Sequence, residues 1–182
     1  WFGFENYDIL PDLFTTAKGL SGGLPQSALV GRRELMDIYA PNTMTSTHSG
    51  SPVASAGTAA NIKFLKEHNM CEEALRKGKI MEEKLKALWK QFPERISYVS
   101  GIGMAWAVTF AEADTHAIHP EFALEVTKKC NENGLTFFAA VGAGITMKLT
   151  PPLTIPDDAL IEGLEAYATA VAEADAIMPA YK

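Results

Sequence analysis

Lys18 stands out because it follows a short apolar segment and opens a run rich in glycine. Residues 9–17 predict a turn and then a short buried strand. The run Lys18-Gly-Leu-Ser-Gly-Gly-Leu-Pro25 holds three glycines and a proline, which demand a special backbone path. A lysine at the end of a buried strand is partly desolvated, which favours its neutral, nucleophilic form. Schiff-base chemistry requires such an amine, but the spacing alone favours an ordinary solvated surface lysine.

A second candidate is the polar loop of residues 44–52, Met-Thr-Ser-Thr-His-Ser-Gly-Ser-Pro. It presents hydroxyl and backbone N–H groups just ahead of a helix that Pro52 is expected to open. That arrangement suits a phosphate group. A serine- and threonine-rich helix cap explains the same residues, and the sequence leaves both interpretations open.

Several other chemistries are excluded by motif and charge. The chain has no Walker motif, no complete dinucleotide fingerprint and no nucleophile elbow, and Gly101-Ile-Gly103 is predicted to form a strand bulge. The histidines and cysteines lack metal-ligand spacing, so no metal is expected. A net charge of −6, from 16 basic and 22 acidic residues, disfavours nucleic acid as a partner. No apolar run is long enough for a membrane helix.

Hydrophobic periodicity predicts an α/β chain whose composition, 47% hydrophobic and 21% charged, is that of a globular protein. Helices are expected over residues 52–68, 71–92, 120–133 and from 156 onward. Strands are expected over residues 13–17, 27–31, 96–99, 104–110, 135–141 and 145–149. The pattern changes near residues 92–96, where a domain boundary is expected. Cys71 and Cys130 are predicted to be buried free thiols in a reducing, cytoplasmic compartment, with one disulfide as the alternative.

Three segments together resemble class III (subgroup II) aminotransferases, which are pyridoxal-phosphate enzymes of fold type I. The segment from Pro11 to Pro25, Pro-Asp-Leu-Phe-Thr-Thr-Ala-Lys-Gly-Leu-Ser-Gly-Gly-Leu-Pro, looks like their cofactor-lysine segment. Thr47-His-Ser-Gly-Ser-Pro52 looks like their Thr-x-x-Gly-Asn-Pro segment. Lys148-Leu-Thr-Pro-Pro-Leu-Thr-Ile155 resembles Arg-x-x-Pro-Pro-Leu-Thr. The order and spacing also fit, and the resemblance covers nearly the whole chain.

The resemblance implies an aminotransferase that moves an amino group between an amine or amino acid and a keto acid. Lys18 would hold pyridoxal 5'-phosphate as a Schiff base and move the proton during transfer. Thr47 would bind the cofactor phosphate in the active site of the other subunit of a homodimer. Lys148 would bind the substrate carboxylate. Residues 1–94 would be the C-terminal part of the large cofactor domain with linking helices, and residues 95–182 the small α+β domain.

Two departures qualify what the resemblance implies. Lys148 replaces the usual arginine, which loses the planar bidentate fork and leaves a point charge; Ser51 replaces the usual asparagine. The family's aspartate that pairs with the pyridinium nitrogen lies upstream of the segment matching Trp1, so the chain is expected to be the C-terminal portion of a longer protein. The alternatives are a racemase or epimerase on the same scaffold, and a non-catalytic fragment that needs a separate N-terminal half.

Overall fold

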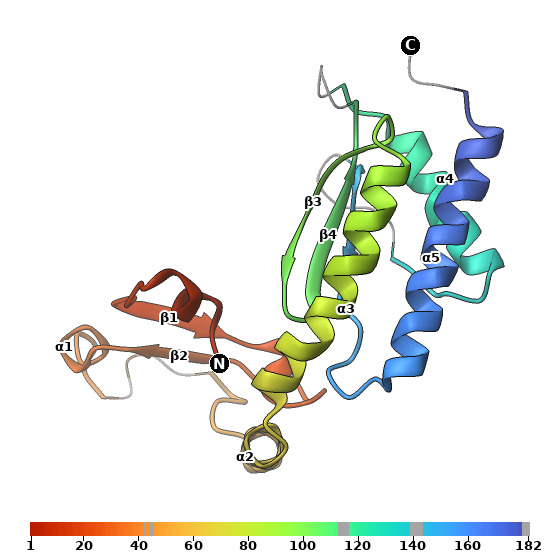
Figure 1. Ribbon diagram of the computed structural model, residues 1–182. Coiled ribbons are helices and arrows are strands. Elements are labelled where there is room, and N and C mark those ends of the chain that lie inside the picture. The colour runs from red at the N-terminus through yellow and green to blue at the C-terminus, as the bar shows by residue number, and fades with distance from the viewer. Residues whose placement is uncertain (42, 44–45, 113–116, 139–143, 180–182) are drawn as a thin grey trace. The chain divides into compact units, whose positions relative to one another are not determined.

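The chain divides by packing into two compact units, Trp1–Cys71 and Glu72–Lys182. The computed structural model describes residues 1–41, 43, 46–112, 117–138 and 144–179. Each unit has its own antiparallel sheet, with two strands in the first and three in the second (Figure 1). The domain boundary of the whole protein at residues 94/95 stays a prediction.

The first unit is built around a small sheet and one long helix. In chain order it contains η1 (Gly3–Tyr7), β1 (Leu13–Thr16), η2 (Lys18–Leu20), β2 (Ala28–Gly31), α1 (Arg33–Met36) and α2 (Pro52–Glu67). Strands β1 and β2 pair antiparallel, with Phe14 opposite Val30, so residues 17–27 form the connection between them. Both strands and the start of α2 at Pro52 confirm the prediction from the sequence.

The first unit has almost no buried core. Among its described residues, only Ala54 and Ser21 are buried. Strand β1 alternates exposed and half-buried residues, so the prediction of a buried strand was wrong. Its Phe14 ring packs instead against Phe2 and Phe4, with centroids 4.7 and 5.4 Å away. Most of the exposed large apolar side chains of the chain lie in this unit, including Trp1, Tyr7, Ile9, Leu10, Leu29, Val30, Ile38, Tyr39 and Val53.

The second unit is a sheet covered on one face by helices (Figure 1). Its elements are α3 (Met70–Gln91), β3 (Ile96–Ile102), β4 (Ala105–Phe110), α4 (Pro120–Glu132), β5 (Thr146–Leu149) and α5 (Asp157–Ile177). The sheet has the order β3-β4-β5. Alternate residues of β4 are buried, which fits a sheet with one covered face. Helices α3, α4 and α5 all contribute to one core, whose fully buried side chains include Met81, Leu85, Val108, Phe110, Phe122, Val126, Met147, Tyr167 and Val171.

The predicted helices agree with the structure, while two predictions about strands were wrong. Gly101-Ile-Gly103 is no bulge: Ile102 pairs with Ala105, so Gly103 lies in a tight hairpin turn, with φ +56°. The register irregularity of β3 falls between Ile96 and Tyr98. Residues 135–138 form no strand, and residues 139–141, the rest of that prediction, lie outside the described residues.

The two cysteines are both free thiols in different environments. Cys130 is buried in α4, and desolvation raises the pKa of its thiol to about 12. Cys71 is exposed, so the prediction that both are buried was wrong for this residue. Neither forms the disulfide that the sequence left open.

A pair of helical glycines gives opposite predictions for the same substitution. In α3, a Cβ on Gly78 would lie 2.5 Å from the carbonyl oxygen of Gly103 and 2.7 Å from its Cα. Because backbone atoms cannot move aside cheaply, Gly78→Ala is expected to lower the free energy of unfolding by about 1–3 kcal/mol. In α5, a Cβ on Gly163 meets only Leu135 Cδ1, at 3.8 Å. Gly163→Ala is expected to raise stability by about 0.5–1 kcal/mol.

Urea unfolding of the two variants beside the unsubstituted protein measures both effects. Equal changes in the free energy of unfolding would contradict the close approach of α3 to the β3–β4 turn.

Candidate active site

Lys18 occupies a strained backbone position directly after β1. It begins η2, and its φ of +52° lies in the left-handed region. For a residue with a Cβ this conformation costs about 1–2 kcal/mol. Such outliers persist only where surrounding structure holds them, and they cluster at active sites. The backbone conformation therefore supports Lys18 as a candidate active-site residue, independently of the sequence motif.

Helix α2 supplies the contacts that hold the turn containing Lys18. The side-chain amide of Asn61 donates hydrogen bonds to the carbonyl oxygens of Gly19, at 2.8 Å, and Leu20, at 3.1 Å. One helical turn earlier, Gly57 faces the side chain of Leu24: a Cβ on Gly57 would lie 2.7 Å from Leu24 Cδ1, so a larger residue there would make the end of the Leu24 side chain move aside. Asn61 thus holds the turn through two hydrogen bonds, and Gly57 on the same side of α2 leaves room for Leu24, further along the same loop.

The Lys18 amine itself is exposed. It lines an open hollow together with Gly19, Gly23, Leu24, Pro25 and Gln26. Within the described part of the chain the amine makes no hydrogen bond or ion pair. The desolvation that the sequence predicted for Lys18 is therefore not supplied by these residues. What they supply is an accessible primary amine at the edge of a glycine-rich surface.

Thr47 lies in a tight turn just before α2. The turn is closed by the Ser49 amide, which donates to the Ser46 carbonyl at 3.1 Å, and by the two serine hydroxyls, 2.8 Å apart. Thr47 is exposed, and α2 starts at Pro52. Part of the polar loop, residues 44–45, lies outside the described residues. Among the described residues no hydrogen bond joins Thr47 to Lys18, although both belong to the first unit.

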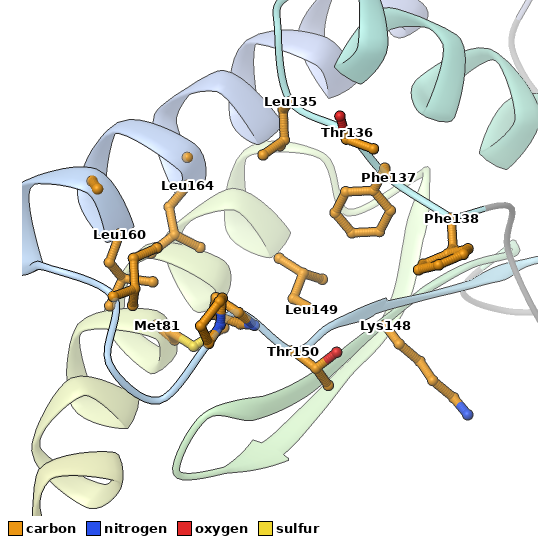
Figure 2. Close-up of a pocket in the computed structure, with 15 residues that line it drawn as sticks. Met81, Leu135, Thr136, Phe137, Phe138, Lys148, Leu149, Thr150, Leu160 and Leu164 are labelled. Carbon is orange, nitrogen blue, oxygen red and sulfur yellow. The ribbon is translucent and has the colours of Figure 1, made fainter. Parts of the chain in front are cut away.

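Lys148 lies in the second unit, on the open face of β5. Met147 and Leu149 are buried, so the alternation of the strand exposes Lys148, which pairs with Ala107 of β4. Figure 2 shows its side chain extending away from the apolar wall formed by Leu160 and Leu164. Lys148 also borders an apolar pocket of about 350 Å³. Lys148 therefore places an exposed positive charge beside an apolar surface.

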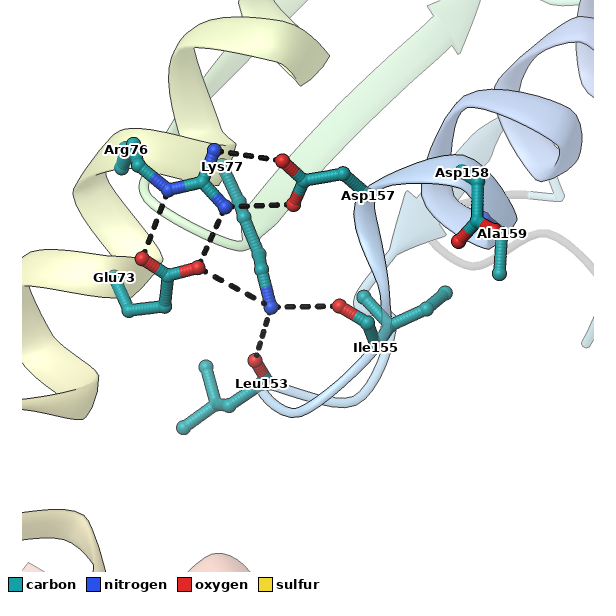
Figure 3. Close-up of polar contacts among 8 residues, drawn as sticks. All are labelled: Glu73, Arg76, Lys77, Leu153, Ile155, Asp157, Asp158 and Ala159. Atoms are coloured by element: carbon teal, nitrogen blue, oxygen red, sulfur yellow. Dashed lines mark hydrogen bonds and ion pairs between the residues drawn. The ribbon is translucent and has the colours of Figure 1, made fainter. Parts of the chain in front are cut away.

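The segment that follows Lys148 is fastened to α3 by a buried lysine (Figure 3). Lys77 Nζ donates to the carbonyl oxygens of Leu153, at 3.0 Å, and Ile155, at 2.6 Å. The same amine lies 3.6 Å from Glu73 Oε1. Because Lys77 is only 5% exposed, little water reaches its amine, and these three oxygen atoms take the place of that water.

A second cation on α3 continues this network. Arg76 forms two hydrogen bonds to Glu73 and two to Asp157 at the start of α5, all between 2.6 and 2.8 Å. The guanidinium holds the pKa of both carboxyl groups below their usual values, and the carboxylates raise the pKa of Arg76. The geometry is bidentate on each side, which is the strong form of such pairs.

Comparison with known proteins identifies the family. A model described as aminotransferase class-III matches residues 1–171. The chain belongs to the class-III aminotransferase family. This confirms the resemblance carried by the three sequence segments.

Individual relatives include aminotransferases and a racemase. A probable 4-aminobutyrate aminotransferase of Bacillus subtilis is 33% identical over 165 residues, which are 90% of this chain and 38% of that protein. A leucine/methionine racemase of Thermococcus litoralis is 34% identical over 176 residues, 96% of this chain and 39% of that protein. The chain thus spans about two fifths of the length of these relatives.

Solved structures show the same fold. An S-selective transaminase from Arthrobacter sp. superposes with a TM-score of 0.85 at 27% identity, covering 98% of this chain and 42% of that one. This confirms the predicted α/β class, part of the fold type I of pyridoxal-phosphate transferases.

The structure also identifies residues of this class-III chain that sequence reasoning missed. Asn61 and Lys77 match no motif. A usable signal existed for Asn61, because it follows Gly57 by one helical turn in a helix that the small residues predict to pack closely. Lys77 had only the weaker signal of a lysine adjacent to Gly78, on the apolar face of α3.

Two observations bear on other chemistries. Within residues 1–41, 43, 46–112, 117–138 and 144–179, no cluster of histidine, cysteine and acidic side chains could hold a metal ion. None of the helices in these ranges has the length and apolarity needed to cross a membrane.

Removing the buried amine tests the fastening of the Leu153–Asp157 segment. Lys77→Met keeps the aliphatic stem but leaves two carbonyl oxygens unpaired, so we expect a loss of about 1–3 kcal/mol in the free energy of unfolding. Lys79→Met, two residues along the same helix on an exposed side chain, is the matched control and is expected to stay within about 0.5 kcal/mol. Equal unfolding midpoints for both variants in urea would contradict the role of Lys77.

The Arg76 network predicts a pH dependence of stability. The pKa of Asp157 is lower in the folded chain than its usual value, so its contribution is present above the ordinary aspartate pKa and is lost as pH falls through the folded pKa. Asp157→Asn is expected to make the loss of stability on acidification shallower, as measured by urea unfolding at a series of pH values. In an Arg76→Gln background the same change is expected to have little effect; an undiminished effect there would refute the pairing.

Proposed function

We propose that the protein is an aminotransferase that holds pyridoxal 5'-phosphate on Lys18. It moves an amino group between an amine or amino acid and a keto acid. The observation that carries the proposal is the exposed amine of Lys18 on a left-handed turn at the end of β1. Membership of the class-III family over residues 1–171 supports it.

The residues present fit this cofactor. An accessible primary amine is the group that condenses with an aldehyde. A Cβ on Gly19 or Gly23 would meet no atom within 4 Å, so the glycine loop beside Lys18 leaves open surface for a flat ring. When bound, pyridoxal phosphate supplies an electron sink for the negative charge that develops at the substrate carbon.

Each predicted residue then has a separate task. Lys18 Nζ would hold the cofactor aldehyde and would then serve as the base that carries the proton taken from the substrate carbon. The Thr47 hydroxyl, in its turn ahead of α2, binds the cofactor phosphate. The Lys148 ammonium attracts the substrate carboxylate as a point charge, without the bidentate geometry of an arginine.

The assembly follows the same proposal. Residues 1–94 form part of the large cofactor domain with linking helices, and residues 95–182 form the small domain. The exposed apolar side chains of the first unit support a homodimer in which Thr47 serves the partner's site. The two free thiols, Cys71 and Cys130, support a cytoplasmic location.

A racemase is the second candidate function. It is favoured by one observation, the 34% identity to the leucine/methionine racemase of Thermococcus litoralis. In that case Lys18 would return a proton to the substrate carbon instead of the cofactor carbon, with delivery on either face giving both enantiomers, and the amino group would stay on the substrate. The same three residues would serve both reactions, so the residues of the site do not separate them.

A half-reaction separates the candidates. We expect the purified protein loaded with pyridoxal phosphate to lose its visible absorbance when amino donor alone is added, with a stoichiometric yield of keto acid. Lys18→Ala is expected to abolish the visible absorbance and to lower kcat by at least about 10³-fold, because both covalent attachment and proton transfer need this amine. Lys63→Ala, which removes an exposed lysine of α2, is the matched control and is expected to behave as the parent protein.

Two other outcomes would redirect the assignment. Absorbance that persists with donor while the substrate loses optical activity indicates the racemase. Absorbance that survives Lys18→Ala contradicts the assignment of Lys18, and absence of absorbance in the parent protein contradicts a cofactor role for this chain by itself.

A further inference from the structure

We infer that Asn61 is a positioning residue for Lys18: its carboxamide fixes the backbone turn from which the Lys18 amine is presented. The inference rests on the proposed role of Lys18. Among the described residues Asn61 makes no hydrogen bond to the Lys18 amine, so its effect passes through the turn.

The contact joins parts of the chain that are distant in sequence. Asn61 Nδ2 donates to Gly19 and Leu20, which precede it by 42 and 41 residues. Both partners are carbonyl oxygens, which can only accept a hydrogen bond. They therefore bind the amide nitrogen of Asn61 and not its amide oxygen. A carboxylate at this place would set a negative oxygen against two carbonyl oxygens. The chemistry of the contact therefore distinguishes asparagine from its isosteric acid.

The loop also wraps closely around the Asn61 side chain. A Cβ on Gly22 would lie 3.2 Å from Asn61 Oδ1, and Gly22 has a φ of +70°. The amide nitrogen thus faces the start of the loop and the amide oxygen faces its middle. One carboxamide spans residues 19–22, directly after Lys18.

The other hydrogen bonds described for this loop are local. The Leu20 amide donates to the Ala17 carbonyl at 3.1 Å, and the Ser21 hydroxyl donates to the Leu24 carbonyl. The first of these bonds closes around Lys18, whose left-handed φ of +52° costs conformational energy. The two Asn61 hydrogen bonds supply support from outside the turn, so losing them is expected to release Lys18 to other backbone conformations.

The experiment uses three variants of the purified protein. Asn61→Asp replaces the donor with an oxygen at constant shape, and Asn61→Gln keeps the donor. Asn131→Asp is the matched control, since Asn131 donates to the Thr127 carbonyl within its own helix, in the other unit. One readout is hydrogen exchange of the Leu20 amide without cofactor. The other is the pH midpoint of the visible absorbance with pyridoxal phosphate bound.

We expect Asn61→Asp to speed exchange at Leu20 by about tenfold or more, the equivalent of one to two net hydrogen bonds. We also expect it to shift the absorbance midpoint, because the amine then meets the cofactor in a different geometry. Asn61→Gln should restore at least part of both values, and Asn131→Asp should leave both at those of the parent protein.

The two failures are distinguishable. If the absorbance of the parent protein survives Lys18→Ala, the proposed function of Lys18 fails and this inference falls with it. If absorbance depends on Lys18 but Asn61→Asp leaves exchange at Leu20 unchanged, only the inference is overturned. Faster exchange with an unshifted absorbance midpoint also overturns it, since Asn61 then stabilises the loop without positioning the amine.

Discussion

The candidate site depends on one constraint: a lysine held in the left-handed region by contacts from a helix that lies far along the chain. A φ of +52° at Lys18 costs free energy that the surrounding structure must offset. Asn61 of α2 donates two hydrogen bonds to that turn, and Gly57 leaves room for Leu24 of the same loop beside the helix. Helix α2 also follows the polar loop that contains Thr47. One helix thus connects both segments expected to bind the cofactor.

The two units differ in how they are stabilised, and the difference matches their proposed tasks. The second unit buries a continuous core between its sheet and three helices, so its strand β5 is a rigid support for Lys148. Lys77 and Arg76 then fix the segment after β5 through the carbonyl oxygens of Leu153 and Ile155 and the carboxylate of Asp157. The first unit buries little and exposes many apolar side chains. The homodimer proposed above, with its shared active site, would cover some of these side chains.

Much of this could be predicted from local patterns in the sequence. Pro52 at the start of α2 and Gly134 at the end of α4 mark helix ends, because proline and glycine have fixed conformational preferences there. The prediction failed where the outcome depended on tertiary contacts. Gly103 forms a hairpin turn instead of a bulge because Ile102 pairs with Ala105, and no local pattern reports a pairing register. For the same reason, the sequence marked Lys18 by its motif but not its partner Asn61, 43 positions later.

The central claim is that Lys18 is the amine that carries the cofactor. Reduction of the loaded protein with borohydride, followed by digestion and mass spectrometry, measures this most directly, because it fixes the cofactor to whichever lysine holds it. The account predicts the added mass on the peptide that contains Lys18, and on no peptide of the Lys18→Ala variant. Added mass on the peptide of Lys63, Lys148 or any other lysine, with the Lys18 peptide unmodified, would contradict it.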